Sequence, residues 1–431
     1  MKKESIKIWA VLACLLVCMG AMVSSCGSSG KGDDAEKGDS LESNFAALAD
    51  AVQKYDEVSG FSGGLAGVRY GEKYGFINTQ GEEVVPCMYD DIDRFSDGLA
   101  SVRLDGKWGF VSKEGREVIT CKYDDAESFS EGLARVCLDG KYGFVSTDGE
   151  EVIPCKYDKA RDFSEGLASV RLDGKWGFIN KEGKEVIPCK YDGARNFTEG
   201  LARVALDGKC GFVNKEGKEI VPCKYDNNRD FSEGMARVEF GDLWGFVNAK
   251  GELVIPCKYN YAGSFSEGMA QVMHSGREGF VNKEGEEVVP CRYDNVWNFS
   301  EGLAVVVIND KRGFIDKQGK LAIPCKYDDA ESFSEGLAVV VINHKRGFIN
   351  KQGELVIPCK YNYAWSFSDG LAKVCIGDYD TGKWGFVNKE GKEVVPCKYD
   401  EVGPFSEGIA IVKLNGKRGI IARTHKKKEK K

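Results

Sequence analysis

The sequence repeats with a regular period of about 34 residues over most of its length. Each copy contains a glycine that follows one variable, often aromatic, residue and usually precedes a phenylalanine. The residues before this glycine are Tyr74, Trp108, Tyr142, Trp176, Cys210, Trp244, Glu278, Arg312, Arg346, Trp384 and Arg418. The steps between them are equal, except that the step from Arg346 to Trp384 is four residues longer. A fixed period of this size is typical of a repeat array, in which each unit stacks on its neighbours.

Each unit predicts three short β-strands. Residues 98–104 alternate apolar and polar side chains, as in a strand with one buried face. Asp105-Gly106 suits a two-residue type I′ hairpin turn, and residues 107–111 follow as the second strand. Residues 117–121 predict a third strand, which carries proline in nine of its ten copies and so should be irregular or lie at a sheet edge. The predicted fold class is all-β, a tandem array of about eleven three-stranded units.

Two arrangements of these units are open. Propellers typically have about four to eight blades of four strands, so eleven three-stranded units would make a wide ring. The last copy also ends at residue 422 without its third strand, although residues 50–56 could supply part of that strand from the other end of the chain. We therefore predict an elongated β-solenoid or superhelix, with a closed β-propeller-like ring as the alternative.

The N-terminal segment, 1–26, predicts export. Lys2, Lys3 and Lys7 precede an apolar stretch that ends in small residues, which indicates a signal peptide rather than a membrane span. The segment 23–26 resembles a bacterial lipobox, and this resemblance implies that Cys26 is lipidated and becomes the first residue of a lipoprotein. It also implies a lipid-anchored location in the bacterial cell envelope, at the outer membrane or the cell surface. The alternatives are a plain secretory signal and a single membrane anchor.

The predicted organisation has five parts. They are a lipoprotein signal peptide at 1–26, a flexible tether at 27–44, a short helix or cap at 45–53, the repeat array at 54–422 and a basic tail at 423–431. The tether has too few apolar side chains to offset the entropy of ordering it. The whole chain has a net charge of -7, and the segment 1–26 carries three Lys and one Glu, or +2, which leaves -9 for the rest. This acidic balance argues against nucleic acid as a partner.

One cysteine recurs at the same place in ten units. These residues are Cys87, Cys121, Cys155, Cys189, Cys223, Cys257, Cys291, Cys325, Cys359 and Cys397. A disulfide needs Cα atoms within about 7 Å, whereas sheets that pack face to face stand about 10 Å apart. No CxxC spacing and no recurring histidine accompanies the column, which disfavours zinc. We interpret these thiols as small buried hydrophobic side chains and predict no metal site.

The aromatic residues before the repeated glycine have two interpretations. Facing inward, they belong to the core, which is favoured because Phe110 and its equivalents lie on the same face of the strand. Exposed, such rings could bind sugar faces, and arginine at three of the last four copies keeps this interpretation open. The candidate ligand-contact residues are Tyr74, Trp108, Tyr142, Trp176, Trp244 and Trp384. The glycine that follows each ring predicts a close approach by another backbone or ring.

The repeated words resemble those of the WG-repeat family of bacterial proteins. Residues 175–180 read Lys-Trp-Gly-Phe-Ile-Asn, preceded by Glu-Gly-Leu-Ala and followed by Val-Ile-Pro-Cys-Lys-Tyr-Asp. The resemblance covers roughly residues 54–422, and five copies depart from the aromatic-glycine pair: Cys210, Glu278, Arg312, Arg346 and Arg418. The family implies a β-repeat array without known catalysis.

An enzyme would need a unique constellation of reactive groups. His274, His344 and His425 lie in different units and no recurring nucleophile stands beside them, so we predict neither catalytic residues nor a cofactor. The first functional hypothesis is a lipid-anchored envelope protein that acts as a scaffold for a protein partner through its long repeated surface. The second is a glycan- or cell-wall-binding module that uses the aromatic residues. An enzyme whose site escapes the sequence is the weakest alternative.

Overall fold

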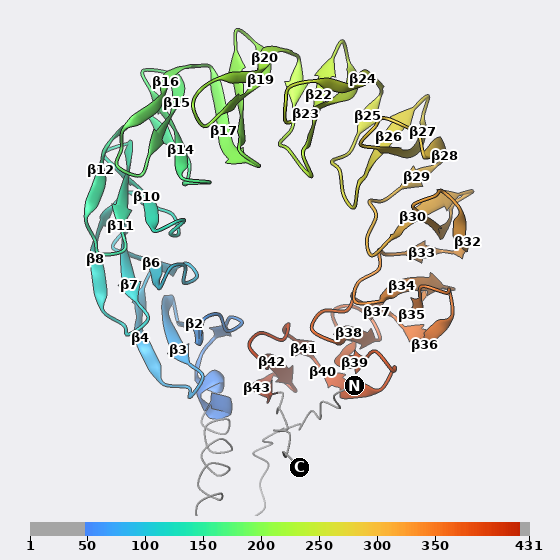
Figure 1. The fold of residues 1–431 in the computed structure, drawn as a ribbon. Coiled ribbons are helices and arrows are strands. Elements are labelled where there is room, and N and C mark those ends of the chain that lie inside the picture. The colour runs from blue at the N-terminus through green and yellow to red at the C-terminus, as the bar shows by residue number, and fades with distance from the viewer. Residues whose placement is uncertain (1–47, 423–431) are drawn as a thin grey trace, which may run out of the picture.

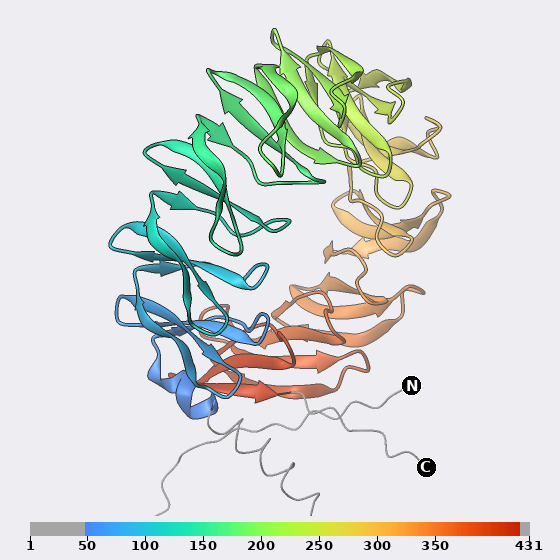
Figure 2. The ribbon, with the colours of Figure 1, turned by 60° about the vertical axis from the view of Figure 1, so that its left-hand side comes forward.

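The computed structural model of this chain describes residues 48–422. Within them, 43 strands form eleven antiparallel sheets, ten of four strands and one of three. The sheets follow one another in chain order around a common centre, as the blades of a ring (Figure 1). Figure 2 shows the same succession from another side, with the first and last blades again next to each other. The predicted signal peptide, its Cys26, the tether and the basic tail lie outside the described residues.

Each blade begins with a short inner strand and continues outward. The inner strands are β1 (Glu57–Val58), β5 (Asp91–Ile92), β9 (Asp125–Ala126), β13 (Lys159–Ala160), β17 (Gly193–Thr198), β21 (Asn227–Asn228), β25 (Tyr261–Ala262), β29 (Asn295–Val296), β33 (Asp329–Ala330), β37 (Tyr363–Ala364) and β41 (Glu401–Val402). The second strands are β2 (Leu65–Tyr70), β6 (Leu99–Leu104), β10 (Leu133–Leu138), β14 (Leu167–Leu172), β18 (Leu201–Leu206), β22 (Met235–Phe240), β26 (Met269–His274), β30 (Leu303–Ile308), β34 (Leu337–Ile342), β38 (Leu371–Ile376) and β42 (Ile409–Leu414).

The third strands carry the repeated glycine, and the fourth strands carry the repeated cysteine. The third strands are β3 (Lys73–Asn78), β7 (Lys107–Ser112), β11 (Lys141–Ser146), β15 (Lys175–Asn180), β19 (Lys209–Asn214), β23 (Leu243–Asn248), β27 (Arg277–Asn282), β31 (Lys311–Asp316), β35 (Lys345–Asn350), β39 (Lys383–Asn388) and β43 (Lys417–Ala422). The fourth strands are β4 (Glu83–Tyr89), β8 (Glu117–Tyr123), β12 (Glu151–Tyr157), β16 (Glu185–Tyr191), β20 (Glu219–Tyr225), β24 (Leu253–Tyr259), β28 (Val289–Tyr293), β32 (Leu321–Tyr327), β36 (Leu355–Tyr361) and β40 (Glu393–Tyr399). Figure 1 shows β8, β12 and β16 at the outer rim.

The all-β class, the eleven units and the hairpin chemistry are confirmed, while the number of strands per unit needs correction. Asp105 and Gly106 both have positive φ, 52° and 77°, as a type I′ turn requires. The segment between the predicted third strand of one unit and the first predicted strand of the next, however, contributes a fourth strand. In the second blade, Asp91 and Ile92 pair with Arg103 and Val102. Two residues are too short a run to show the alternation by which a strand is recognised in a sequence.

The core lies between blades rather than within them. Leu133, Phe144, Ile153 and Tyr157 of the third blade pack against apolar side chains of the fourth, among them Phe163. The rings of Phe144 and Phe163 meet edge to face with their centroids 4.8 Å apart, an arrangement that aromatic pairs favour. Similar pairs recur between neighbouring blades from Phe76–Phe95 to Phe386–Phe405. Each blade therefore depends on its neighbours on both faces to bury its apolar side chains.

Polar contacts repeat between the blades as well. The hydroxyl of Ser96 donates to the carbonyl of Phe129 at 2.8 Å, and the backbone N–H of Gly132 donates to Asp97 at 3.0 Å. Asp97 belongs to a column of acidic residues that lies just before the second strand of every blade except the first, which has Gly63 there. Most members of this column also pair with a lysine of the next blade, as Glu131 does with Lys181 at 3.2 Å. The acidic column is therefore neutralised between units.

The glycine after each aromatic residue allows the outer strand to approach. A Cβ atom on Gly177 would lie 2.4 Å from the carbonyl oxygen of Ile187, and equivalent clashes occur at this glycine in each of the first ten blades. The pairing register shifts beside it, between Trp176 and Phe178, as in a β-bulge. The expected close approach is confirmed. Only glycine fits where two backbones come this near each other.

We predict that Gly177→Ala destabilises the ring and that Gly419→Ala does not. The last blade has no outer strand, and the nearest atom to a Cβ on Gly419 is a methyl group of Val412 at 3.9 Å. We expect a loss of about 1–3 kcal/mol for Gly177→Ala, as for other overpacked sites, and at most about 0.5 kcal/mol for Gly419→Ala. Urea unfolding followed by circular dichroism measures both. Equal losses in the two variants would show that the close approach of the outer strand is not the cause.

The eleventh blade contacts the first through the same kinds of hydrogen bonds that join consecutive blades. Ser406 donates to the carbonyl of Phe61, and the N–H of Gly64 donates to Glu407 at 3.0 Å. These bonds join residues 345 and 343 positions apart, yet they have the same partners by type as the bonds between consecutive blades. The ring is therefore closed, and the preferred prediction of an elongated solenoid is wrong. Closure gives the two terminal faces partners, so neither needs a cap.

A segment from the start of the array replaces the missing outer strand of the last blade. Residues 48–54 are helical. Leu48, Val52 and Tyr55 join Ile409 and Ile420 in one buried cluster with residues of the first blade. Arg418 donates to the carbonyl of Tyr55 at 2.9 Å. The N-terminal end thus completes the last blade, as the closed-ring alternative required, but with a helix instead of a strand. Within residues 48–422, no helix is long and apolar enough to cross a membrane.

We predict that Val52→Asp opens the ring at this seam. The Val52 side chain is fully buried, so an aspartate there would place an unpaired charge in the cluster that joins the ends. Small-angle X-ray scattering should show a larger radius of gyration, while circular dichroism still reports the β-sheets. Gln53→Asp is the matched control, because Gln53 is exposed on the same helix and should leave the radius unchanged. Equal radii for the two variants would contradict this role of the helix.

Candidate functional site

One position differs strongly from blade to blade; it lies just after the inner strand in ten blades and within β17 in the fifth. Two residues further on, every blade has phenylalanine, from Phe61 to Phe405. The variable position carries Ser59, Asp93, Glu127, Arg161, Arg195, Arg229, Gly263, Trp297, Glu331, Trp365 and Gly403. Because the shared residues are used in blade packing, the side chains that distinguish one part of the ring from another gather at its inner side. Candidate sites are therefore expected at the inner side of the ring.

A pocket of about 680 Å³ lies where the ring closes. Its lining comes from the first two blades and the last two. Small residues make the space, because Ser59 and Gly403 stand where other blades have tryptophan or arginine, and Gly67 stands where Arg203 stands in the fifth blade. The pocket is thus a consequence of the sequence differences among the units. A uniform array would fill it.

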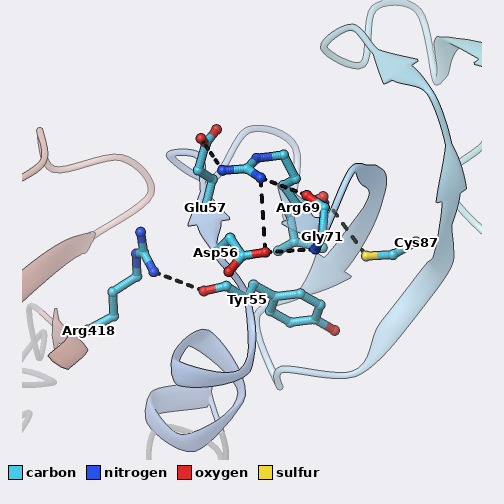
Figure 3. A network of polar contacts seen from close by, with 8 residues as sticks. Tyr55, Asp56, Glu57, Arg69, Gly71, Cys87 and Arg418 are labelled. Carbon is cyan, nitrogen blue, oxygen red and sulfur yellow. Dashed lines mark hydrogen bonds and ion pairs between the residues drawn. The ribbon is translucent and has the colours of Figure 1, made fainter.

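Ion pairs and hydrogen bonds fix the wall of this pocket in the first blade (Figure 3). Arg69 donates to Glu57 at 2.6 Å and to the carbonyl of Gly71 at 2.6 Å. Asp56 accepts a bond from the N–H of Gly71 at 2.7 Å, which holds the hairpin in place. The bond from Arg69 lowers the pKa of Glu57, so this carboxylate is ionised at neutral pH. The wall therefore presents fixed charges.

The opposite wall also carries charges. In the last blade, Lys413 pairs with Glu401 at 3.1 Å. Around the whole pocket, five basic side chains (Arg69, Arg94, Lys373, Lys413 and Arg418) face three acidic ones (Glu57, Asp93 and Glu401). This mixture of donors, acceptors and excess positive charge can hold a polar segment by hydrogen bonds.

The six aromatic residues singled out by the sequence are spread around the ring, one to a blade. Trp176 and Trp384 are only 9% and 4% exposed, and Tyr74, Trp108, Tyr142 and Trp244 are half-buried. A basic side chain covers several of them, as Arg103 does over Trp108, 5.7 Å from the ring centroid. The structure does not bring the six together into one continuous platform.

Arginine at the aromatic position is accompanied by a ring from another strand. Arg312 lies 4.6 Å from the ring centroid of Trp297, and Arg346 lies 5.3 Å from that of Tyr363. In these two cases the cation is on a third strand and the ring lies in or just after an inner strand. The contact between cation and ring is therefore kept, although the residue before the repeated glycine is no longer aromatic. The signal in the sequence was the appearance of Trp297 and Tyr363 near inner strands, but a link to arginines 15 to 17 positions away needs the fold.

The tenth blade exposes an aromatic cluster that sequence reasoning missed. The four extra residues of this unit lengthen a hairpin and bring Tyr379 against Trp384, with ring centroids 5.6 Å apart. Trp365 lies 5.0 Å from Trp384. Tyr379 is 55% exposed and Trp365 is 40% exposed. Both line a hollow of about 390 Å³ together with Lys373. The length of the insertion was the only signal for this cluster in the sequence.

The repeated cysteines are free thiols, half-buried rather than fully buried. Each Sγ lies near the carbonyl of a valine in its own blade, as Cys121 does near Val102 at 3.7 Å. Burial raises the pKa of Cys189 to about 11 and that of Cys397 to about 12. These thiols are therefore protonated at neutral pH, and a protonated thiol is a poor nucleophile.

The remaining candidates for chemistry are dispersed. His274 and His344 are exposed in the seventh and ninth blades, and His425 lies outside the described residues. Among residues 48–422, no group of three or more His, Cys, Asp or Glu side chains is arranged to hold a metal ion.

Comparison with known proteins identifies the repeat. A family model described as "WG containing repeat" matches eleven successive segments of the chain between residues 52 and 417. A search of curated proteins found no match.

Solved structures match this chain at low identity and low TM-score. A eukaryotic initiation factor has 9% identity and a TM-score of 0.37, over 76% of this chain and 94% of that one. PorZ, a surface component of the type-IX secretion system of Porphyromonas gingivalis, has 9% identity and a TM-score of 0.23, over 86% and 74% of the two chains. Hsv2 of Kluyveromyces lactis has 10% identity and a TM-score of 0.25, over 68% and 96%. At these scores the similarities carry no functional argument.

Proposed function

This chain belongs to the WG-repeat family, and we propose that it is a lipid-anchored protein of the bacterial cell envelope whose ring is a non-catalytic scaffold for a protein partner. The observation that carries the binding role is the pocket at the seam, where the ring departs from its own repeat. The ring needs no small side chain at Ser59, Gly67 or Gly403 for its packing, because larger ones stand at these places in other blades. A bound segment that enters the pocket explains this space better than the packing of the ring does.

The chemistry of the pocket suggests what enters. Its walls carry ion pairs that are already formed, such as Glu57 with Arg69, and these leave further donors for a guest. A volume of about 680 Å³ suits a short stretch of polypeptide. The excess of basic side chains favours a stretch that carries an acidic residue. We therefore place a polar segment of a partner protein at the seam, inserted from the inner side of the ring.

The proposal of a non-catalytic role rests on the dispersal of reactive groups. A general base and a nucleophile must lie within hydrogen-bond distance of each other or of the substrate. The described histidines are exposed on separate blades, and the thiols of the repeated column have raised pKa values. A ring built from one repeated unit has its singular residues at the inner side, where binding is the simplest use for them.

The lipid anchor is tested by replacing the proposed acylated residue. We expect that Cys26→Ala abolishes incorporation of radiolabelled palmitate and moves the protein from the membrane pellet to the soluble fraction. Cys18→Ala is the matched control, because it removes a cysteine from the same segment and should change neither result. Equal labelling of the two variants would exclude Cys26 as the site of lipidation.

The partner site is tested by filling the pocket. Gly403 and Gly263 occupy the same place in two blades, and at each an added Cβ would first meet a neighbour at 3.3 Å. We expect Gly403→Trp to lower the affinity for the partner at least tenfold, because the indole would occupy the pocket. Gly263→Trp, away from the pocket, should bind normally. Affinity capture from solubilised envelope with the full chain, followed by protein mass spectrometry and titration, measures this. A partner that binds both variants equally would refute the seam as its site.

A glycan-binding function is the second candidate, favoured by the exposed cluster in the tenth blade. Aromatic faces stack on the apolar faces of sugars, and Trp365 and Tyr379 are exposed beside a hollow of about 390 Å³. A glycan would bind at this cluster and not along the six aromatic residues that are spread around the ring. In the same capture experiment, sugar analysis of the retained material reports on it. Polysaccharide that Trp365→Ala releases and Gly403→Trp does not would favour this function over the protein scaffold.

A further inference from the structure

Three consecutive blades carry arginine at the variable position two residues before the repeated phenylalanine. These residues are Arg161, Arg195 and Arg229, whereas the second, third and ninth blades have Asp93, Glu127 and Glu331 there. The described chain thus has an arc of positive charge at its inner side although the whole protein is acidic. Part of this arc lines one open hollow, where several arginines come close together.

The hollow lies between the fourth, fifth and sixth blades and measures about 180 Å³. Its lining includes Arg161 from the fourth blade, Arg195 and Arg203 from the fifth, and Asn228 from the sixth. The indole of Trp176 also lines it and lies under Arg161, 5.4 Å from the guanidinium carbon to the ring centroid. Three guanidinium groups therefore border one small space, and no acidic side chain is among the residues that line it.

Two of these arginines lack an ion-pair partner among residues 48–422. Arg203 is held by Asn228, whose Oδ1 accepts a bond from Nε at 2.9 Å, and by Asp230 at 3.7 Å. Arg161 has no ion pair, and its buried Nε has no hydrogen-bond acceptor in the described part of the chain. Arg195, exposed at the hollow, makes no ion pair with a described residue. Two of the three guanidinium groups therefore have unused donors.

The third blade shows how the same protein pairs the arginine that corresponds to Arg203. Arg135 pairs with Glu127 at 2.9 Å and with Asp162 at 3.3 Å. A buried charge is normally compensated in this way, because leaving it unpaired is costly. In the fifth blade, Arg195 stands where the third blade has Glu127, so Arg203 keeps the counterpart of Asp162, which is Asp230, but has a cation in place of the second carboxylate.

Electrostatics point the same way. Burial lowers the pKa of Arg161 and of Arg203, and in both cases the nearby Arg195 lowers it further. A like charge that lowers the pKa of a neighbouring arginine raises the free energy of the folded protein. A bound anion would remove this penalty and would satisfy the unpaired N–H groups.

We propose that the hollow bordered by Arg161, Arg195 and Arg203 binds an oxyanion group: a carboxylate, sulfate or phosphate. Guanidinium groups bind such groups through paired, charge-assisted hydrogen bonds, and the planar fork of arginine matches their geometry. Asn228 positions Arg203 by its bond to Nε and is itself fixed, since its Nδ2 donates to the carbonyl of Gly211 at 2.9 Å. The anion belongs either to a free solute or to an acidic sugar residue. The proposal is independent of the seam pocket and of the lipid anchor.

Calorimetric titration of the full chain, purified in detergent and kept at constant ionic strength with sodium chloride, tests this site. The probes are inorganic sulfate, inorganic phosphate, galacturonate and polygalacturonate. We expect saturable binding of at least one probe, with affinity about tenfold to a hundredfold lower in Arg195→Gln because one charge-assisted interaction is lost. Binding of the inorganic ions or the monomer indicates a free solute, and binding of the polymer alone indicates an acidic polysaccharide.

Arg116→Gln is the matched control. It removes the same charge from a side chain that is 80% exposed on a hairpin of the second blade, so its affinity should equal that of the unmodified protein. Without a probe, Arg195→Gln should unfold at the same temperature as the unmodified protein or a higher one, because it relieves repulsion among the arginines. No saturable binding of any probe, or equal affinity in the two variants, would overturn the proposal. Unfolding of Arg195→Gln at a lower temperature would also overturn it, since the arginine would then support the fold itself.

Discussion

Packing between neighbouring blades is the interaction on which the rest of this structure depends. Each blade buries apolar side chains on both faces, and the edge-to-face contact of Phe144 with Phe163 recurs around the ring with little change. A single blade has no core of its own, so it is stable only between two neighbours. Closure follows from the same constraint, because an open array would leave the apolar faces of the first and last blades in water. The helix at 48–54 makes closure feasible despite the missing last strand.

The repeat and its exceptions have different roles. Gly177 and its equivalents, the paired phenylalanines and the half-buried thiols all serve the packing of the ring. Where a unit departs from the repeat, the ring has surface features that the other blades lack. The small residues Ser59, Gly67 and Gly403 leave space for the pocket where the ring closes. The four extra residues near Tyr379 expose an aromatic cluster. Binding functions in such an architecture are therefore expected at the exceptions.

Charge compensation separates structural from functional polar groups in this ring. Glu57 with Arg69, and Arg135 with Glu127, are satisfied pairs that fix geometry. The Arg161 guanidinium is partly buried, borders other arginines and makes no ion pair with a described residue. Beside Arg203, stability alone would favour a carboxylate at position 195, where the third blade has Glu127. An arrangement that forgoes this stabilisation is a common property of sites that must receive a ligand.

The sequence by itself determined the repeat unit, the class of fold and the reason for its glycines, because strand alternation, type I′ turns and close backbone approach are local properties of a few neighbouring residues. It also indicated which residues vary. Only the tertiary structure decided that eleven units close into a ring, since closure depends on the small rotation between blades, which leaves no pattern in any one unit. The sites were hidden for the same reason. Ser59 and Gly403 line one pocket, and Arg161 and Arg203 line one hollow, only after stacking has brought separate blades together.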